Sequence, residues 1–484
     1  MPRPSSPRIP KIDRCNRRLK EARRLMAEMA DEICADPEDF WQRSKAIRSV
    51  MADVMWEDEQ QRLDEAAFNT QEVEVDGERY RHLAQPSSLL LQGFWGAHRV
   101  AEPLYRLIGV RNGPTIRPLL HKIGAVEGSL LPDFADEAGE LLSELTDREL
   151  ETTLARLSFR PPSRTTIRNR LGGLVAGMSE RTRELEEECR AVEELDFDVA
   201  AVSCGLDRFA VRMDETFPDG PERDRKLSQR RPEEEYERTP PEPYESNYRM
   251  AWAANVTLYD TSGNSRRSFR YGAEAGHDVD VLVDRVVNDV VHVCSGRQDV
   301  HVACIQDGAG DLEPLRRELR ERLPEGVPRR HLVDFHHAIG YLDAVVAAHN
   351  DGDPHNMAGW YRLKLLTDDN GAEHIVRHLR RAVAVLDDEG SRLAEALGAA
   401  LSYFEKRRPA MKYAEARASK LPIGSGSTES TCGLFQLRVK HPGSHWRPPG
   451  LHGTLTVRAL HLSGRWETAF RAQHKTLVHE VHAM

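Results

Sequence analysis

The chain has 484 residues, of which 39% are hydrophobic and 30% charged, and this composition is typical of a globular protein of about three domains. No run approaches the roughly 18 uninterrupted apolar residues of a membrane span, and the basic N-terminus lacks the apolar core of a signal peptide. We therefore expect a soluble, cytoplasmic protein with no membrane partner. The seven cysteines form no Cys-x-x-Cys pair, which favours reduced thiols and argues against a zinc ribbon.

The net charge of −10 argues, taken alone, against a nucleic-acid partner, but the basic residues are unevenly distributed. Met1 to Arg24 contains nine Lys and Arg against two acidic residues, and Lys406 to Lys475 contains thirteen against three. A basic C-terminal segment on an acidic chain can hold a phosphate backbone. The alternative is a solvated charged face.

Residues 1–190 are predicted to form a mainly helical N-terminal region. It begins with a charged amphipathic helix over Lys11–Met55 and includes three short helices between residues 133 and 178. Thr146–Glu149 is a capping box that starts the middle helix, and Ser163 caps the third. A helix-turn-helix with an arginine-rich second helix is the geometry of a major-groove reader, although simple packing is the alternative. The candidate DNA ligands there are Arg164, Arg168 and Arg170.

Residues 195–337 change to the pattern of a sheet. A strand over Val199–Met213 carries Asp207, and a proline-rich loop over Phe217–Asn247 follows it. Next come a hairpin, a valine-rich segment that is either helical or extended, and a buried strand that ends at Asp307. A helix with Pro314 in its first turn and a short strand that runs into Asp334 complete this part.

Residues 338–420 are predicted to be a helical insertion, and residues 421–484 the C-terminal part of the core. There Glu429 opens a basic helix that leads to Arg438 and Lys440. This order of elements predicts an α/β fold with a ribonuclease-H-like catalytic domain. Its first and fourth strands are neighbours, so Asp207 and Asp307 meet and Glu429 joins them from a flanking helix. Three carboxylates so placed can hold two Mg²⁺ ions, with Mn²⁺ as a substitute, for phosphoryl transfer.

Five short stretches in this order resemble insertion-sequence transposases of the ISKra type, relatives of the Mutator-like DDE group. They are Gly205–Arg208, Asp307–Ala309, Asp334–His337, Ile423–Gly426 with Glu429, and Ser463–Trp466. The resemblance implies that Asp207, Asp307 and Glu429 are the metal-binding triad. It also implies that Asp334 and His337 form an auxiliary Asp-x-x-His signature; a strand-end turn with a buried, hydrogen-bonded His is the alternative.

The segment Lys440–Arg447 is also similar to that family. Its Trp446 can stack on an unpaired base near a transposon end, while a packed core tryptophan is the alternative. The resemblance implies a DDE transposase that cleaves and joins double-stranded DNA at terminal inverted repeats and in target DNA, acting as a homodimer or larger assembly. Two rival functions remain open: a nuclease or resolvase of the same fold, and an inactive, domesticated DNA-binding descendant.

Overall fold

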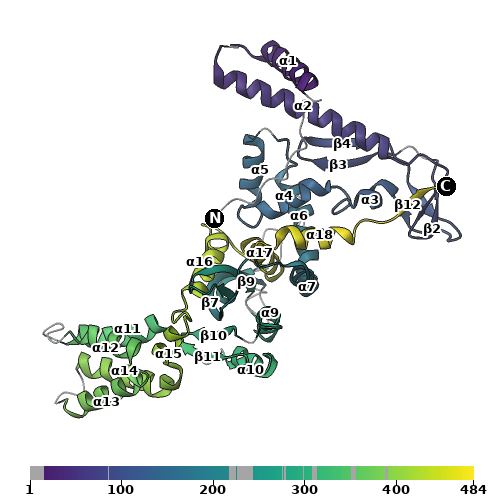
Figure 1. Ribbon diagram of the computed structural model, residues 1–484. Helices are drawn as coiled ribbons and strands as arrows, with labels where there is room; N and C mark the ends of the chain where they lie inside the picture. The colour runs from purple at the N-terminus through teal and green to yellow at the C-terminus, as the bar shows by residue number, and fades with distance from the viewer. Residues whose placement is uncertain are drawn as a thin grey trace. The chain divides into compact units, whose positions relative to one another are not determined.

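The computed structural model describes residues 16–36, 38–84, 87–157, 159–216, 225, 244–274, 276, 279–297, 299–307, 313–349, 356–386 and 391–484. It is a mixed α/β protein with two compact units (Figure 1). Unit 1 comprises residues 1–174 and 473–484, and unit 2 comprises residues 175–472. Among the described helices, none is both long and apolar enough to cross a bilayer.

Unit 1 begins with α1 (Asn16–Ile33) and α2 (Phe40–Ala66). The single helix predicted over Lys11–Met55 is therefore wrong. The reason is that Asp39 caps α2, accepting hydrogen bonds from the backbone N–H groups of Trp41 and Gln42, and so begins a new helix.

Strands that the sequence analysis did not assign follow α2. A five-stranded sheet has the order β12-β1-β2-β5-β6, and β3 pairs with β4 in a separate hairpin. In β1 buried valines alternate with half-buried glutamates, the pattern of a sheet with one covered face. The strands are β1 (Glu72–Val75), β2 (Glu78–His82), β3 (Leu89–Gly93), β4 (Gly96–Val100), β5 (Tyr105–Leu107), β6 (Thr115–Ile116) and β12 (Val481–Ala483).

The three predicted short helices between residues 133 and 178 are confirmed as α4 (Pro132–Leu141), α5 (Asp147–Arg156) and α6 (Arg164–Glu180), after the short α3 (Pro118–Ile123). Both halves of the Thr146–Glu149 capping box form. Ser163 caps α6, accepting from the Thr166 N–H at 3.4 Å.

Two predicted boundaries differ from the compact units. Unit 2 begins within α6, not near residue 190, because α7 (Thr182–Val192) is tied to α9 (Val279–Cys294) by a buried ion pair between Glu186 and Arg285 at 2.7 Å. Residues 473–484, predicted to be part of the catalytic core, belong to unit 1 because β12 pairs with β1.

The centre of unit 2 is a five-stranded sheet of order β11-β10-β7-β8-β9. Strands β7, β10 and β11 are parallel, whereas β8 and β9 run antiparallel to their neighbours. The strands are β7 (Ala201–Thr216), β8 (Tyr244–Tyr259), β9 (Ser265–Ala273), β10 (His301–Gln306) and β11 (Arg329–Val333). The predicted hairpin and buried strand are confirmed. Most of the predicted loop Phe217–Asn247 lies outside the described residues, and its last residues belong to β8.

Helices cover both faces of this sheet. On one face α9 and α10 (Glu313–Arg322) bury the largest apolar cluster, and the valine-rich segment is thus a helix. On the other face lie α15 (Tyr413–Ala418), α16 (Gly426–Val439) and α17 (Pro448–Leu462), and α18 (Trp466–Lys475) follows.

The described residues between β11 and α16, where the helical insertion was predicted, are mainly helical. They contain α11 (Phe335–Ala348), α12 (Met357–Thr367), α13 (Gly371–Ala384), α14 (Arg392–Arg407), a 3-10 turn (Arg408–Ala410) and α15. Helices α11 to α14 form a block with its own apolar core beside the sheet (Figure 1). The insertion leaves the sheet at the end of β11 and returns just before α16.

Candidate functional site

Asp207 and Asp307 follow the paired part of β7 and β10. The four pairs run from Ala201 opposite His301 to Cys204 opposite Cys304. Asp207 lies three residues further along β7, and Asp307 lies directly after the end of β10. Side chains alternate along a strand, so both aspartates belong to the sheet face that α15 and α16 cover. Asp207 is partly exposed and Asp307 exposed.

The first turn of α16 lies against β7 two residues before Asp207. A Cβ added at Gly205 would overlap the hydroxyl of Thr428 and lie 2.8 Å from the carbonyl oxygen of Ile305 on β10. Thr428 itself is buried and donates its hydroxyl to Asn255 on β8 at 2.6 Å. Only glycine allows β10 and α16 to approach β7 this closely. Glu429, the next residue of that turn, is exposed.

A buried thiol lies between the predicted carboxylates of β7 and α16. Cys432 Sγ donates a hydrogen bond to Asp207 Oδ2 at 3.4 Å. Burial raises the pKa of the Cys432 thiol, and the negative charges of Asp207 and Glu429 raise it further. The thiol is therefore a neutral donor, and both carboxylates act electrostatically on one buried group. The sequence analysis missed Cys432, and its only signal is the spacing of one helical turn from Glu429.

Asp334 connects three segments at the same edge of the sheet. Its backbone N–H donates to the carbonyl oxygen of Gln306 at 2.6 Å. Its carboxylate caps α11 by accepting from the His337 N–H, and it also accepts from the backbone N–H and the hydroxyl of Ser425. The same Ser425 hydroxyl lies 2.9 Å from Glu429 Oε1, so its one proton is shared between the two carboxylates. Asp334 is 1% exposed, so it positions the end of β10 and the loop before α16.

His337 is the exposed member of the Asp-x-x-His pair, so the alternative of a buried His at a strand-end turn does not describe it. Its ring lies 5.7 Å from that of Tyr403, whose hydroxyl donates to the carbonyl oxygen of Asp307 at 3.0 Å. Burial raises the pKa of Tyr403, and the carboxylates of Asp307 and Asp334 contribute. The predicted auxiliary pair is thus beside Asp307.

The three predicted carboxylates have the chemistry that Mg²⁺ prefers, since they are hard oxygen donors with access to solvent. Their side chains accept hydrogen bonds from neighbours: Asp207 from Cys432 and Glu429 from Ser425. In this arrangement no three His, Cys, Asp or Glu side chains of the described residues are grouped to hold a metal ion.

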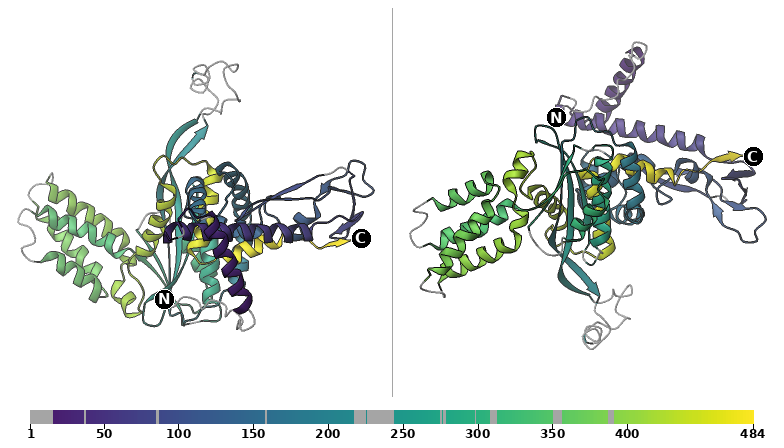
Figure 2. Two further views of the ribbon diagram at one scale, coloured as in Figure 1. Left: turned by 90° about the horizontal axis from the view of Figure 1, so that it is seen from above. Right: turned by 60° about the horizontal axis from the view of Figure 1, so that its bottom comes forward.

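One face of the β7–β8 ribbon combines arginine with exposed apolar groups. Arg208 is paired across the strands with Trp252, and Arg212 with Tyr248. Tyr248 is 73% exposed and Met250 is 46% exposed. Figure 2 shows this ribbon extending from the helix-covered part of the sheet. The sequence analysis did not single out this surface; its signal is the alternation of residue types along the two strands.

The arginines predicted to contact DNA lie on α6, and two of them are exposed. Arg168 forms an ion pair with Asp147 at 2.9 Å, and Arg170 donates to the carbonyl oxygen of Glu127 at 2.9 Å. Arg164 is half-buried and its backbone N–H is bonded to Glu151. Their contact with DNA stays a prediction.

Of the predicted DNA-binding residues Arg438, Lys440 and Trp446, Arg438 is buried and Trp446 is half-buried. Arg438 is 8% exposed, and its guanidinium lies 5.5 Å from the Trp446 ring. Trp446 is half-buried, donates its indole N–H to the carbonyl oxygen of Val439 at 2.8 Å, and pairs through its backbone with β7. These contacts give Trp446 a packing role, and its stacking on a base stays a prediction. Lys440 is exposed.

The stretch Ser463–Trp466 has a structural role. Arg465 is 3% exposed and pairs with Asp289 at 2.8 Å and Glu193 at 2.6 Å. Tyr271 also donates its hydroxyl to Asp289. Ser463 accepts from the Arg270 N–H at 2.8 Å. These contacts fix the end of α17 to β9 and α9.

Comparison with known proteins gives one distant likeness to report. Over 69% of this chain and 79% of the other, the protein is similar to a chain of the Drosophila P element transposase strand transfer complex, at 12% sequence identity and a TM-score of 0.25. No protein-family model and no curated protein matches. The function therefore has to be inferred from the geometry of the site and from its residues.

Proposed function

We propose that this chain is a DDE transposase, a metal-dependent enzyme that cleaves DNA at the ends of an insertion sequence and joins those ends to target DNA. The observation that supports the proposal is the parallel pairing of β7 with β10, because Asp207 and Asp307 each follow the last paired residues, Cys204 and Cys304, by three positions, and the first turn of α16 packs on Gly205.

The strand order also supports the proposal. In order along the chain, the five strands of unit 2 are arranged 5-4-1-2-3, with the first strand parallel to the fourth and antiparallel to the second. This is the arrangement that we expect for a ribonuclease-H-like domain. The helical insertion after the fifth strand fits the same class, as does α16, which follows the insertion and carries Glu429 in its first turn.

Within this proposal Asp207, Asp307 and Glu429 hold two Mg²⁺ ions, which supply activation of the attacking oxygen and stabilisation of the leaving one. Cys432, protonated at neutral pH, orients Asp207 by its hydrogen bond. Asp334 fixes the end of β10 and the loop before α16, and so sets the positions of Asp307 and Glu429. The arginine and aromatic face of the β7–β8 ribbon supports a DNA substrate, since guanidinium groups pair with phosphates and aromatic rings stack on bases.

Metal binding and DNA cleavage by aspartate variants of the full chain test the proposal. Asp207→Asn and Asp307→Asn should each weaken Mn²⁺ binding, measured by electron paramagnetic resonance, and abolish Mg²⁺-dependent cleavage of a duplex carrying the element's end. Asp299→Asn is the matched control, because Asp299 is an exposed acid at the opposite end of the same strand. Wild-type cleavage by Asp307→Asn would contradict the proposal.

Strand joining separates the transposase from a nuclease or resolvase of the same fold. A pre-cut duplex end with a free 3′-hydroxyl is offered together with a supercoiled plasmid. A transposase joins the two, whereas a nuclease only nicks the plasmid, and an inactive descendant does neither while still binding DNA. We expect joining to need at least a dimer, since two ends are processed together.

A further inference from the structure

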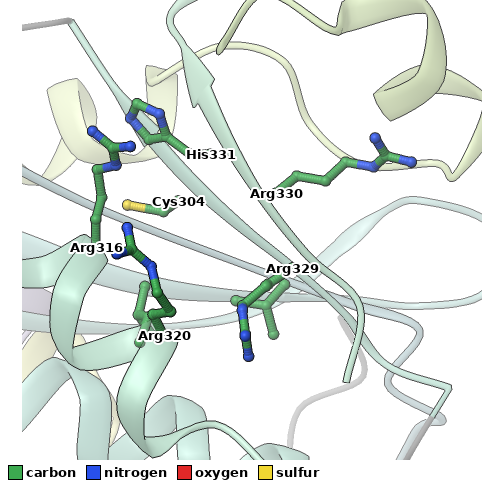
Figure 3. Close-up of a pocket in the computed structure, with 8 residues that line it drawn as sticks. Cys304, Arg316, Arg320, Arg329, Arg330 and His331 are labelled. Atoms are coloured by element: carbon green, nitrogen blue, oxygen red, sulfur yellow. The ribbon is translucent and has the colours of Figure 1, made fainter. Parts of the chain in front are cut away.

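A pocket lies on the α10 side of the sheet, away from the predicted carboxylates. It has an empty volume of about 460 Å³, part of which is open solvent. Its floor is formed by Val302 and Cys304 of β10 and Leu319 of α10. Register places Arg329 and His331 of β11 directly opposite Val302 and Cys304. Figure 3 shows Arg316, Arg320 and His331 gathered around Cys304.

The pocket has more positive than negative charge. In the described part of the chain, the ion pairs of Arg316 and Arg320 go to a single carboxylate, Glu313, at 2.8 and 4.0 Å. No carboxylate of the described residues lies within ion-pair distance of Arg329. Arg330 differs, because it forms an ion pair with Glu415 at 2.6 Å and points away from the pocket (Figure 3). Two of these guanidinium groups, those of Arg316 and Arg320, therefore share one counter-charge.

His331 is a neutral member of the pocket lining. Burial, and to a smaller extent the nearby charge of Arg316, lowers the pKa of His331 to about 4, so its imidazole is neutral at neutral pH. Its Nε2 lies 3.3 Å from Gln306 Oε1, and an amide oxygen only accepts, so Nε2 carries the proton. The positive charge of the pocket therefore comes from its arginines.

We propose that this pocket is a binding site for a phosphate group, held by Arg316, Arg320 and Arg329 over an apolar floor. Planar guanidinium groups bind phosphate oxygens in pairs, and the partly enclosed floor strengthens those hydrogen bonds relative to open solvent. The phosphate belongs either to a free phosphate compound or to the backbone of bound DNA. The site is separate from the carboxylates and does not depend on the proposed function.

The pocket is connected to the end of β10. Gln306, which pairs with His331, also donates to Cys304 Sγ at 3.4 Å and immediately precedes Asp307. Gln306 is 3% exposed, and its carbonyl oxygen accepts from Asp334. An occupied pocket therefore stiffens the segment that carries Asp307.

Binding measurements on the full chain test the pocket. The wild type is compared with Arg316→Gln/Arg320→Gln and with Arg329→Gln in two assays. One is isothermal titration calorimetry with sodium pyrophosphate, and the other is fluorescence anisotropy with a labelled DNA duplex. Arg317→Gln is the matched control, since Arg317 is exposed on the same helix but does not line the pocket. All variants are first compared with the wild type by circular dichroism and thermal unfolding.

We expect each guanidinium lost to weaken pyrophosphate binding about tenfold or more, while Arg317→Gln has little effect. Loss of both pyrophosphate and duplex affinity identifies the ligand as a DNA phosphate. Loss of pyrophosphate affinity alone identifies a free phosphate compound. If the pocket variants bind both probes as tightly as Arg317→Gln, the proposal is overturned. The same measurements in an Asp207→Asn/Asp307→Asn background should be unchanged, so failure here is distinguishable from failure of the proposed function.

Discussion

Substitution of Gly205 by alanine tests the close approach on which the candidate site depends. The new methyl group would overlap the hydroxyl of Thr428 and crowd the carbonyl oxygen of Ile305. The carbonyl is part of the sheet backbone and has little freedom, so α16 has to move away from β7. That movement also strains the buried hydrogen bond from Thr428 to Asn255.

Two costs add in this variant. Overpacking a well-packed core costs about 1–3 kcal/mol. A buried polar group that loses its partner costs about 1–3 kcal/mol more, whereas the lower flexibility of alanine in the unfolded chain returns about 0.5–1 kcal/mol. We therefore expect Gly205→Ala to lower the free energy of unfolding by roughly 1–5 kcal/mol.

Urea unfolding followed by circular dichroism measures this loss. Gly433→Ala on α16 is the matched control, because Gly433 is exposed and a Cβ there meets nothing within 4 Å. Its expected effect is a gain of up to about 1 kcal/mol, since alanine is the better helix former. A loss in Gly205→Ala of less than about 1 kcal/mol relative to this control would refute the packing of α16 on β7.

Three further predictions concern the buried ion pair, the pocket histidine and the ribbon. Arg465→Met should cost about 3–5 kcal/mol in urea unfolding, because it removes the closer of the two cations that pair with the buried Asp289 and leaves only Arg190, at 3.8 Å. A loss below about 1 kcal/mol would contradict this. The pKa of His331 is lowered from 6.5 to about 4, so the unfolded chain binds the extra proton between these values. The free energy of unfolding of the wild type should therefore fall more steeply than that of His331→Gln as pH drops from 6.5 to 4. If the two free energies change with pH in parallel, His331 is not a neutral buried imidazole. Tyr248→Ala should weaken binding of single-stranded DNA about fivefold or more, since one stacked base is worth about 1–3 kcal/mol. Leu437→Ala, at an exposed position of α16, is its control. If both variants bind the DNA with equal affinity, the ribbon is not part of the DNA-binding surface.

Several elements of both units could be predicted because their signals are local. The apolar run before Asp307 has the length and composition of a central strand, and β10 spans His301–Gln306. The Thr146–Glu149 capping box of unit 1 needs only four consecutive residues, and it forms as predicted. In contrast, the strands of unit 1 were not predicted, because they are only two to five residues long and such short runs give little periodicity.

The candidate site likewise contains some residues that could be predicted from the sequence and others that could not. The positions of Asp207, Asp307 and Glu429 in the order of elements led to the prediction that they meet, whereas Cys432, which donates to Asp207, is marked in the sequence only by its spacing from Glu429. The sequence is consistent with either a base-stacking or a packing role for Trp446, and only the fold shows that Trp446 pairs with β7.

Periodicity and capping act over a few neighbouring residues, and they predicted the strands and helices of unit 2, the caps Thr146 and Ser163 in unit 1, and the acids near strand ends. Which of these groups are buried, and which lie side by side, is visible only in the folded chain. Gly205 matters because Ile305 and Thr428 approach it from 100 and 223 residues away, and β1 finds its partner β12 near the other end of the chain. Such contacts depend on the packing of the whole unit, and no short segment of the sequence encodes them.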